Sequence, residues 1–383
     1  MRILIASDKF KGSATGAEVA EALALGIREI IPDAEIEAVP VADGGEGTVD
    51  AALASGFEAV TVSVTGPTGE AVAARFAVHG ADAVIEMAAA SGLDVLPGGE
   101  KAALTATSRG TGELITAALD RGCTTIVLGV GGSANTDGGA GMLQALGVSL
   151  RAGDGDMPPG GAALVALDSI DVAGLDPRIA DATIVLASDV DNPLLGDRGA
   201  AAVFAPQKGA SADDVAALEA GLSRFAALLE VQAGVRPSAE LPGAGAAGGV
   251  GYAALAVLGA RREPGIDVIQ RLTGLGERIA DADLVITGEG SLDDQSLGGK
   301  TPLGVAAAAR AAAVPVVAVC GRSTLTEAQA ADAGFLAVLP LSELEPDPAA
   351  SMANATALLL QLGRRIATEI IPRSLAGSWS SMG

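Results

Sequence analysis

The sequence predicts an α/β protein: a parallel-sheet, Rossmann-like domain with a second α/β domain, containing some antiparallel strands, inserted into it. At 383 residues the chain exceeds the length at which one hydrophobic core stops growing, so two domains are expected. Hydrophobic residues make up 49% and are mostly aliphatic, with only six Phe, one Tyr and one Trp, which is typical of helices packed on a buried sheet. We place the first domain at residues 1–62 and 270–383, and the inserted domain at 63–269.

The opening of the chain follows a strand, helix, strand order. An apolar strand at Arg2–Ser7 precedes a helix from about Thr15 to Ile31, which Pro32 and Asp33 close. A second strand is expected from Glu35 to Ala42, before another helix. This order predicts a parallel sheet whose ligand-binding groups gather at the carboxyl ends of its strands.

The middle of the chain begins with a different pattern. Residues 58–87 predict three short strands joined by Gly-Pro and His-Gly turns, an antiparallel meander that marks a change of domain. Further along we expect helices at 112–121 and about 212–229, strands at 124–130 and 183–187, and a glycine- and proline-rich surface loop at 151–161.

From residue 283 onward, strands and helices alternate again. We expect strands within 314–320 and 335–339, and a final helix from about Ala349 to Ile371. The tail at 374–383 is expected to be disordered.

Charge and rare residue types exclude several classes of protein. With 24 basic and 47 acidic side chains the net charge is −23, which repels nucleic acid and anionic membranes, so an anionic substrate needs a local site. Cys123 and Cys320 lie in apolar contexts, which favours buried thiols in a reducing cytoplasm. No apolar run approaches 18 residues, and we expect a cytoplasmic protein.

The only histidine is His79, which leaves no second imidazole for a His-dependent triad or for most zinc sites. Acid–base chemistry would therefore fall to carboxylates or to lysine.

A glycine-rich, acidic loop follows the apolar strand that starts at Leu284 and leads to Gly299, Lys300 and Thr301 at the start of a helix. Backbone N–H groups, a lysine and carboxylates that bind Mg²⁺ together suit phosphoryl transfer. The spacing is not that of a Walker A loop, which needs glycine where Asp294 stands. Lys300 also fits a solvated position in a first helical turn.

Two segments resemble dinucleotide-binding fingerprints. Residues 129–134 fit G-x-G-x-x-A after a strand, and residues 243–248 fit G-x-G-x-x-G without one. Neither belongs to the opening strand-helix-strand unit. The alternative explanation is a glycine turn that lets a helix and a strand approach closely.

Seven motifs in order resemble the bacterial glycerate kinases that phosphorylate the 2-hydroxyl group. They are Asp8 with FKGS at 10–13, VPVADGGEGT at 39–48, SRGTGEL at 108–114, GVGGSANTDGGAGMLQALG at 129–147, SDVDNPL at 188–194, GAGAAGGVG at 243–251 and TGEGSLDDQSLGGKTPLGVA at 287–306. Two departures stand out: Asn135 and Thr136 occur in the reverse of the usual order, and Lys9 replaces a serine.

The resemblance implies a set of roles that phosphoryl transfer requires: a proton acceptor, cations for the phosphoryl charge and a basic grip on the substrate carboxylate. A turn or a helix cap is the structural alternative for the acidic candidates, and a surface position for Arg109. The catalytic candidates are Asp189, as the base, with Asp191 and Lys300. The substrate-binding candidates are Asp43, Glu46, Lys11, Ser13 and Arg109. The nucleotide-binding candidates are Gly288, Gly290, Gly299, Lys300 and Thr301, and those for metal are Glu289 and Asp293.

The resemblance implies ATP- and Mg²⁺-dependent phosphorylation of glycerate, from (R)-glycerate to 2-phosphoglycerate, in a cleft between the two domains. Phosphorylation of the 3-hydroxyl group, a dinucleotide-dependent oxidoreductase and a non-catalytic sugar-acid binding protein are the alternatives. The expected partners are glycerate and ATP, without nucleic acid or membrane, and the chain could be a monomer or a homodimer.

Overall fold

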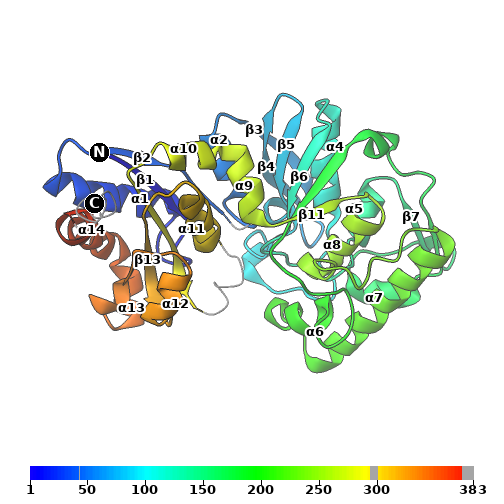
Figure 1. Ribbon diagram of the computed structural model, residues 1–383. Helices are drawn as coiled ribbons and strands as arrows, with labels where there is room; N and C mark the ends of the chain where they lie inside the picture. The colour runs from blue at the N-terminus through cyan, green and yellow to red at the C-terminus, as the bar shows by residue number, and fades with distance from the viewer. Residues whose placement is uncertain (43, 294–300, 373–383) are drawn as a thin grey trace. The chain divides into compact units, whose positions relative to one another are not determined.

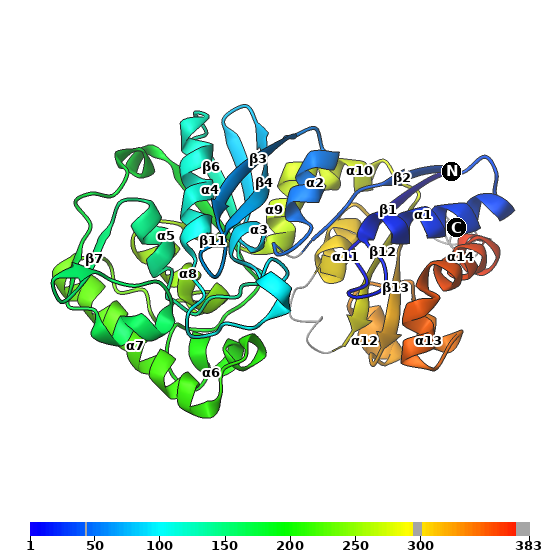
Figure 2. The same cartoon turned by 180° about the vertical axis from the view of Figure 1, so that it is seen from behind.

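The computed structural model describes residues 1–42, 44–293 and 301–372 (Figures 1 and 2). The chain forms two compact units, Met1–Asp43 with Ile266–Gly383, and Gly44–Gly265. Residues 44–62, predicted in the first domain, belong to the second unit because β3 (Glu58–Thr65) pairs along its whole length with β4 (Ala71–His79). Residues 266–269 belong to the first unit, where Ile266 packs beside Gly304.

The first unit is built on the predicted parallel sheet, with strand order β14-β13-β12-β1-β2. Strand β2 ends at Ala38 rather than at Ala42. Val39 donates a last hydrogen bond to the carbonyl of Ile5, and Pro40 then has no N–H to continue the ladder. The strands are β1 (Arg2–Ser7), β2 (Glu35–Ala38), β12 (Leu284–Leu292), β13 (Val316–Ser323) and β14 (Ala337–Pro340).

Helices cover both faces of this sheet, as its apolar strands require. On one face, Ile3 and Ile5 of β1 share a buried cluster with helices α1 and α14, and α11 contacts β12, β13 and β1 from the other (Figures 1 and 2). The helices of this unit are α1 (Gly16–Ile30), α9 (Gly265–Thr273), α10 (Leu275–Ala280), α11 (Thr301–Ala311), α12 (Glu327–Asp332), α13 (Pro348–Ala353) and α14 (Ala355–Arg365).

The ends of these helices follow from local chemistry. Thr15 and Glu18 form a capping box at the start of α1, which satisfies two free N–H groups. The predicted final helix is broken at Asn354, which leaves the helical conformation (φ −110°, ψ 17°), and α14 continues into one π-helical turn, Ile366–Ile370. The tail predicted to be disordered lies outside the described residues.

The second unit contains a six-stranded mixed sheet of order β11-β10-β6-β5-β4-β3. Strands β11, β10, β6 and β5 are parallel, whereas β5, β4 and β3 form the predicted antiparallel meander. The remaining strands of this sheet are β5 (Asp82–Glu86), β6 (Thr125–Gly129), β10 (Thr183–Ala187) and β11 (Arg261–Glu263).

A small antiparallel sheet corrects the loop predicted at 151–161. Strand β7 (Ser149–Ala152) pairs with β8 (Gly155–Asp156) and with β9 (Ser169–Asp171). Its hairpin is turned by Gly153 at φ +58°, so the glycines that suggested a loop are those of a β-turn.

One apolar core holds the second unit together and joins its sheets to its helices. Tyr252 and Phe225 meet edge to face in it, with ring centroids 6.2 Å apart. The helices are α2 (Thr48–Ala54), α3 (Ala88–Ser91), α4 (Arg109–Asp120), α5 (Ala140–Ala145), α6 (Ala200–Phe204), α7 (Ala212–Gln232) and α8 (Ala246–Ala256).

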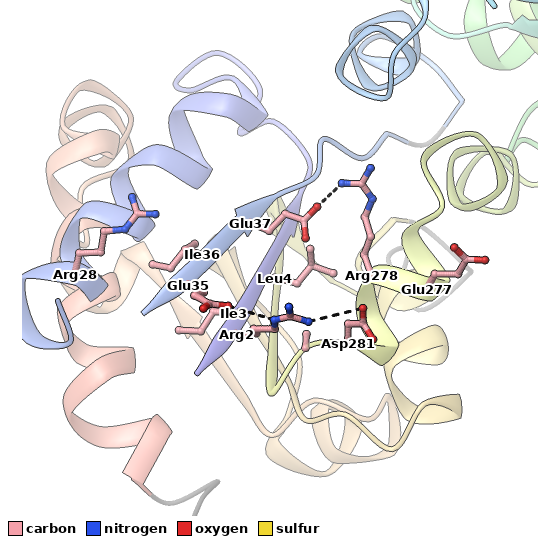
Figure 3. A pocket seen from close by; sticks show the side chains of 11 residues that line it. Arg2, Ile3, Leu4, Arg28, Glu35, Ile36, Glu37, Glu277, Arg278 and Asp281 are labelled. Atoms are coloured by element: carbon pink, nitrogen blue, oxygen red, sulfur yellow. Dashed lines mark hydrogen bonds and ion pairs between the residues drawn. The ribbon is translucent and has the colours of Figure 1, made fainter. Parts of the chain in front are cut away.

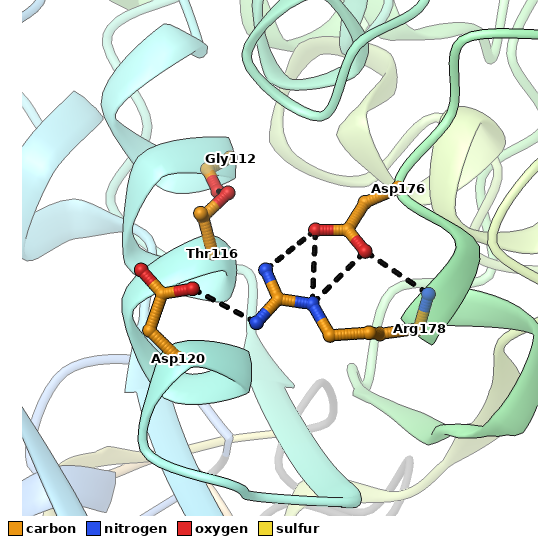
Figure 4. A network of polar contacts seen from close by, with 5 residues as sticks. All are labelled: Gly112, Thr116, Asp120, Asp176 and Arg178. Carbon is orange, nitrogen blue, oxygen red and sulfur yellow. Dashed lines mark hydrogen bonds and ion pairs between the residues drawn. The ribbon is translucent and has the colours of Figure 1, made fainter.

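An exposed polar network ties the end of α4 to a later turn (Figure 4). Arg178 donates to Asp120 at 2.8 Å and to Asp176, whose side chain also caps the backbone N–H of Arg178. The hydrogen bonds with Asp176 and then with Asp120 raise the pKa of the Arg178 guanidinium. Exposed ion pairs contribute little to the free energy of unfolding, so the main effect of this network is to fix the local geometry.

Neither a disulfide nor a membrane-spanning helix occurs among the described residues. Cys123 and Cys320 are both buried free thiols, as predicted. Burial, together with Glu289 and Glu343, raises the pKa of the Cys320 thiol to about 12. No helix in the described ranges is long and apolar enough to cross a bilayer.

The packing of α1 on α14 predicts the effect of a single methyl group. A Cβ atom on Gly26 would overlap the carbonyl oxygen of Leu360, whereas one on Gly276 meets nothing within 4 Å. We expect Gly26→Ala to lower the free energy of unfolding by roughly 1–3 kcal/mol, the usual scale for overpacking. Urea denaturation measures it. Gly276→Ala is the matched control and should be neutral or stabilising, by at most about 1 kcal/mol. Equal midpoints for both variants would show that the contact is not tight.

Candidate active site

In the first unit, a cavity of about 580 Å³ opens at the carboxyl ends of β1 and β12. This is the edge of a parallel sheet at which α/β proteins bind ligands. The cavity is lined on one side by polar groups and glycine, namely Asp8, Lys9, Lys11, Ser13, Glu289, Gly290, Ser291, Gly321 and Arg322, and on the other largely by apolar groups including Phe10, Leu341, Pro346, Pro348 and Met352. It brings together Lys11, Ser13, Glu289 and Gly290, four of the residues selected from the sequence.

The segment after β1 is a tight turn that presents Lys11 to solvent. Phe10 and Ala14 exchange backbone hydrogen bonds of 2.8 and 3.0 Å, and Gly12 adopts the left-handed conformation at φ +78°. Ser13 donates its hydroxyl to the carbonyl of Phe10 at 3.0 Å. Ser13 therefore shapes this turn, and Lys11 lies exposed at its tip.

Strand β12 continues past the end of β1 and carries the acidic candidates. Glu289 lies opposite Cys320 and Ser291 opposite Arg322 of β13. Arg322 donates to the hydroxyl of Ser291 at 3.1 Å, and that hydroxyl donates to Asp293 at 3.4 Å. Arg322 was not selected from the sequence, because nothing in its local pattern separates it from a surface arginine. The structure adds it to Lys9 and Lys11 as a cation that lines the cavity.

Three of the predicted residues, Asp43, Gly299 and Lys300, lie outside the described residues. Thr301, which follows them, is buried at the first position of α11. Gly288 lies in β12, where its backbone carbonyl accepts a hydrogen bond from Asp8 at 2.9 Å. In the described ranges, no three His, Cys, Asp or Glu side chains lie close enough together to hold a metal ion.

A cavity of about 600 Å³ lies at the opposite end of the same sheet (Figure 3). Several of its charged side chains are paired with one another: Arg2 contacts Glu35 at 3.2 Å and Asp281 at 3.8 Å, and Arg278 pairs with Glu37. None of the candidate residues that the structure describes lines it. It lies at the amino ends of β1 and β2, so we do not assign it to the reaction.

In the second unit, three loops meet through backbone contacts at the carboxyl edge of the mixed sheet. A Cβ atom on Gly131, after β6, would lie 2.7 Å from the Cα atom of Gly45. A Cβ atom on Gly44 would lie 3.1 Å from that of Ala187, at the end of β10. The glycines of the 39–48 and 129–147 motifs are therefore the points at which these segments touch.

Glu86, at the end of β5, fixes the loop that bears Glu46. Its Oε1 atom accepts hydrogen bonds from the backbone N–H groups of Gly47 at 3.0 Å and Val49 at 2.7 Å, at the start of α2. A carboxylate there satisfies free N–H groups and interacts favourably with the helix dipole. The sequence suggested a cap built from Asp43 or Glu46 with Thr48. Thr48 instead donates to the carbonyl of Gly45 at 2.7 Å, and Glu46 is exposed.

Asp189 and Asp191 follow β10 and hold different partners. The Oδ1 atom of Asp189 accepts a hydrogen bond from the backbone of Gly265 at 2.9 Å. Asp191 forms an ion pair of 2.7 Å with Arg262, which also donates to the carbonyl of Ser188 at 3.0 Å. Arg262 of β11, which sequence reasoning missed, thus supports the loop from the neighbouring strand.

Arg109, the first residue of α4, has its ion-pair partner in its own helix. Its guanidinium pairs with Glu113 one turn along α4, at 3.1 Å, and Glu113 also accepts from the backbone of Thr65 at 2.6 Å. Arg109 lines a cavity of about 430 Å³ in which no other candidate side chain takes part.

A buried polar cluster in the 133–137 loop was also missed. Asp137 is fully buried and accepts five hydrogen bonds of 2.8–3.2 Å, from the N–H and hydroxyl of Ser108, the side chain of Asn135 and the N–H groups of Gly139 and Gly141. Lys208 is 1% exposed and donates to the hydroxyl of Ser133 at 2.7 Å and to the carbonyl of Asn135. The sequence marked the loop as a polar turn, but nothing around Lys208 singled it out.

Comparison with known proteins identifies the family. The sequence model of the glycerate kinase family matches residues 3–371. The chain belongs to the glycerate kinase family. It is 49% identical over 328 residues to glycerate 2-kinase from Escherichia coli K12, covering 85% of this chain and 86% of that protein. It is 49% identical over 325 residues to glycerate kinase from Bacillus subtilis 168, covering 84% and 85%.

A solved structure resembles this chain over nearly its whole length. The crystal structure of a protein from Salmonella typhimurium LT2 that carries the provisional name glycerate kinase 2 superposes with a TM-score of 0.83 at 43% identity. The match covers 98% of this chain and 99% of that one. The resemblance inferred from the seven motifs is thus confirmed.

The glycine fingerprints have another explanation in this family member. In a dinucleotide site the glycine loop opens a helix directly. Here the loop after Gly129 runs through the buried polar turn before α5 begins at Ala140. The 243–248 segment follows no strand and enters α8, where Ala247, Gly248 and Gly249 have positive φ. Both are turns that allow close packing.

The burial of Lys208 makes the free energy of unfolding depend on pH. Burial lowers its pKa from 10.5 to about 7, against an opposing effect of Asp137. Between these values the unfolded chain binds more protons than the folded chain, so stability rises with pH there, by up to about 1.4 kcal/mol per unit. We therefore expect the free energy of unfolding of the wild type, minus that of Lys208→Met, to increase between pH 7 and 10. Urea denaturation at several pH values measures this difference.

Arg178→Met is the control for this measurement, because its guanidinium stays charged throughout the window. The difference between wild type and Arg178→Met should not vary with pH. A difference between wild type and Lys208→Met that is equally flat would contradict the lowered pKa of Lys208.

Proposed function

We propose that this protein phosphorylates glycerate with ATP, converting (R)-glycerate to 2-phosphoglycerate. Membership of the glycerate kinase family over residues 3–371 carries the proposal, and a kinase of this family implies the use of ATP. Two relatives that are 49% identical in sequence to this chain are named glycerate 2-kinase and glycerate kinase. Their names support glycerate as the substrate and its 2-hydroxyl group as the phosphate acceptor.

The nucleotide is assigned to the 580 Å³ cavity of the first unit. Its volume lies within the range of cofactor sites, and it offers cations on one wall and apolar side chains on the other, which suits a nucleotide with charged phosphates and an apolar base. Arg322 can neutralise phosphate oxygens there. We propose that Gly288, Gly290, Gly299, Lys300 and Thr301 complete this site, with phosphates at the start of α11.

A magnesium ion, when bound, would neutralise part of the charge of the phosphates. Mg²⁺ usually takes only one or two protein carboxylates beside phosphate oxygens and water, so a pair of acids fits it better than a cluster. Glu289 lines the cavity, and Asp293 is joined through Ser291 to Arg322, which also lines it. We assign the metal to these two carboxylates.

The acceptor side of the reaction is assigned to the second unit. Asp189 is the proposed general base, because it follows the end of β10 and its carboxylate can accept the hydroxyl proton in a chain whose only histidine is His79. Its bond with Gly265 fixes the orientation of the carboxylate. Asp191 would keep the loop in place through Arg262, and Glu46 and Asp43 would contact the substrate hydroxyl groups.

The substrate carboxylate needs a cation, and two were proposed from the sequence. Arg109 could bind both oxygens, but its guanidinium is shared with Glu113. Lys11 has no such partner among the described residues and lines the cavity at the end of β1. We therefore favour Lys11, supported by Ser13, over Arg109.

The direct test is incubation of the purified protein with Mg·ATP and (R)-glycerate, followed by ADP release and ³¹P NMR of the product. We expect glycerate-dependent ADP release and the signal of a 2-phosphate ester. A 3-phosphate ester would support the glycerate 3-kinase alternative. No ADP release with any glycerate enantiomer would overturn the proposal.

Asp189→Asn tests the general base. The amide oxygen can still accept from Gly265, so the fold should persist, but the variant cannot take the hydroxyl proton. We expect kcat to fall by about 10²-fold or more while the dissociation constant for ATP, measured by calorimetry, changes little. Wild-type turnover in Asp189→Asn would remove Asp189 from this role.

Glu289→Gln combined with Asp293→Asn tests the metal assignment. Removing both charges should raise the Mg²⁺ concentration needed for half-maximal activity more than it raises the KM for glycerate. Titration of activity with Mg²⁺ at fixed ATP separates the two effects. If the KM for glycerate rises more than the Mg²⁺ requirement does, the metal is to be assigned to Asp43 and Glu46 instead.

A further inference from the structure

The burial of Lys208 needs an explanation, because a lysine is almost never fully buried without a partner of opposite charge. Lys208 ends a short turn, Pro206–Lys208, and its side chain is 1% exposed. No carboxylate forms an ion pair with it in the part of the chain that the structure describes. Its ammonium instead meets two neutral oxygens, the hydroxyl of Ser133 at 2.7 Å and the carbonyl of Asn135. Burial on these terms costs free energy, which makes Lys208 a candidate for a functional role.

The oxygens that Lys208 contacts belong to one loop, which is anchored from two sides. Residues 133–137 are buried, and Asp137 holds the far end of the loop through its bonds with Ser108, Gly139 and Gly141. The side chain of Asn135 joins Asp137 at 2.8 Å and the carbonyl of Ala247 at 3.2 Å. Lys208 is the corresponding anchor at the near end.

The near end of this loop leads to the candidate active site. Gly131, two residues before Ser133, packs directly against Gly45, and Gly45 adjoins Glu46. The N–H of Ala134 bonds the carbonyl of Ser91, so the chain cannot slide along its neighbour. Ser133 is therefore connected to the 44–47 loop through two residues of backbone and the contact between Gly131 and Gly45.

We infer that Lys208 is a positioning residue of the proposed kinase: by holding Ser133 and Asn135, it fixes the loop whose glycines set the place of the Glu46 segment. Lys208 does not touch the substrate in this account. Its effect passes through the backbone, so it should alter turnover more than the affinity for ATP. The inference rests on the proposed function for its kinetic readout, but its structural consequence can be measured without any activity.

The buried polar atoms of the loop agree with this role. Within the described residues, Asn135 Oδ1 and Thr136 Oγ1 are buried without a hydrogen-bond partner. Leaving such atoms unpaired costs about 1–3 kcal/mol each, and the contacts made by Lys208 and Asp137 help to offset that cost. Loss of one of these anchors should therefore let the loop move.

The test compares Lys208→Met, Ser133→Ala and the double variant with wild type. Methionine keeps a long apolar side chain but has no N–H to donate. We expect kcat to fall at least 10-fold in Lys208→Met and about 3-fold in Ser133→Ala, with the KM for ATP within 2-fold of wild type. The double variant should be no worse than Lys208→Met, because both changes remove the same contact. Arg178→Met, which removes a cation from the same unit away from the loop, should keep wild-type kcat.

Amide hydrogen exchange gives a readout that does not depend on catalysis. Peptides covering 129–137 and 44–49 should exchange faster in Lys208→Met and in Ser133→Ala, whereas the Arg178→Met variant should match wild type there. Loss of stability with unchanged kcat and unchanged exchange at 44–49 would overturn the positioning role. If Lys208→Met does not fold, the same two readouts in Ser133→Ala decide. Faster exchange at 44–49 in a protein without glycerate-dependent activity would refute the proposed function and leave the coupling between the loops intact.

Discussion

The direct packing of backbone on backbone at the carboxyl edge of the mixed sheet is the constraint on which the proposed acceptor site depends. Gly44, Gly45 and Gly131 have no side chains, so the loops after different strands approach to a distance that any Cβ atom would prevent. Around this contact, Glu86 fixes the start of α2, Arg262 fixes the loop of Asp191, and Lys208 fixes the loop after Gly131. Each of these side chains holds one of the loops in place. The result is a rigid frame that can present Glu46 and Asp189 in a defined geometry.

The first unit places charged side chains around a cavity at the carboxyl ends of its strands. Its parallel sheet places Asp8 and Glu289 at strand ends, and the chain then turns tightly through Gly12 so that Lys11 reaches the rim of the cavity. Cations are scarce in a chain of net charge −23, so a site for an anionic nucleotide has to concentrate those available. Arg322 provides a cation for the phosphates and Lys11 provides one for the substrate carboxylate, and the acidic pair proposed for the metal lies on β12 and just after it. A divalent ion would reconcile these carboxylates with the phosphate charge.

The sequence predicted those strands and sheets that are marked by runs of buried apolar residues. Strand β10 was located to the residue, because Thr183–Ala187 is a continuous apolar run between polar segments. The antiparallel meander and the parallel sheet also followed from such runs. The hairpin of β7 and β8 was missed because its strands are short, polar and glycine-rich, the composition of a loop. The domain boundary was misplaced because pairing between β3 and β4 is a long-range contact that no local pattern reveals.

Residues of the candidate site were singled out by the sequence where a motif lies near the end of a strand, as at Asp189, Glu289 and Lys11, and their roles stay predictions. The residues that hold the candidate site in place were not singled out. Glu86 closes an ordinary strand, Arg262 lies in a basic pair, and Lys208 stands in the unremarkable segment Pro206–Lys208. Their importance comes from partners 37 to 75 positions away in the chain, so only the fold brings it into view.

The most direct test of this account is a single methyl group at the contact between the loops. A Cβ atom on Gly131 would lie 2.7 Å from Gly45, whereas one on Gly155, in the small antiparallel sheet, meets nothing within 4 Å. Neither glycine requires a left-handed backbone, so alanine tests space alone. The measurement is kcat/KM for glycerate in Gly131→Ala and Gly155→Ala, at a temperature at which circular dichroism shows both to be folded. The account predicts a loss of at least 10-fold in Gly131→Ala and none in Gly155→Ala, and wild-type activity in a folded Gly131→Ala protein would contradict it.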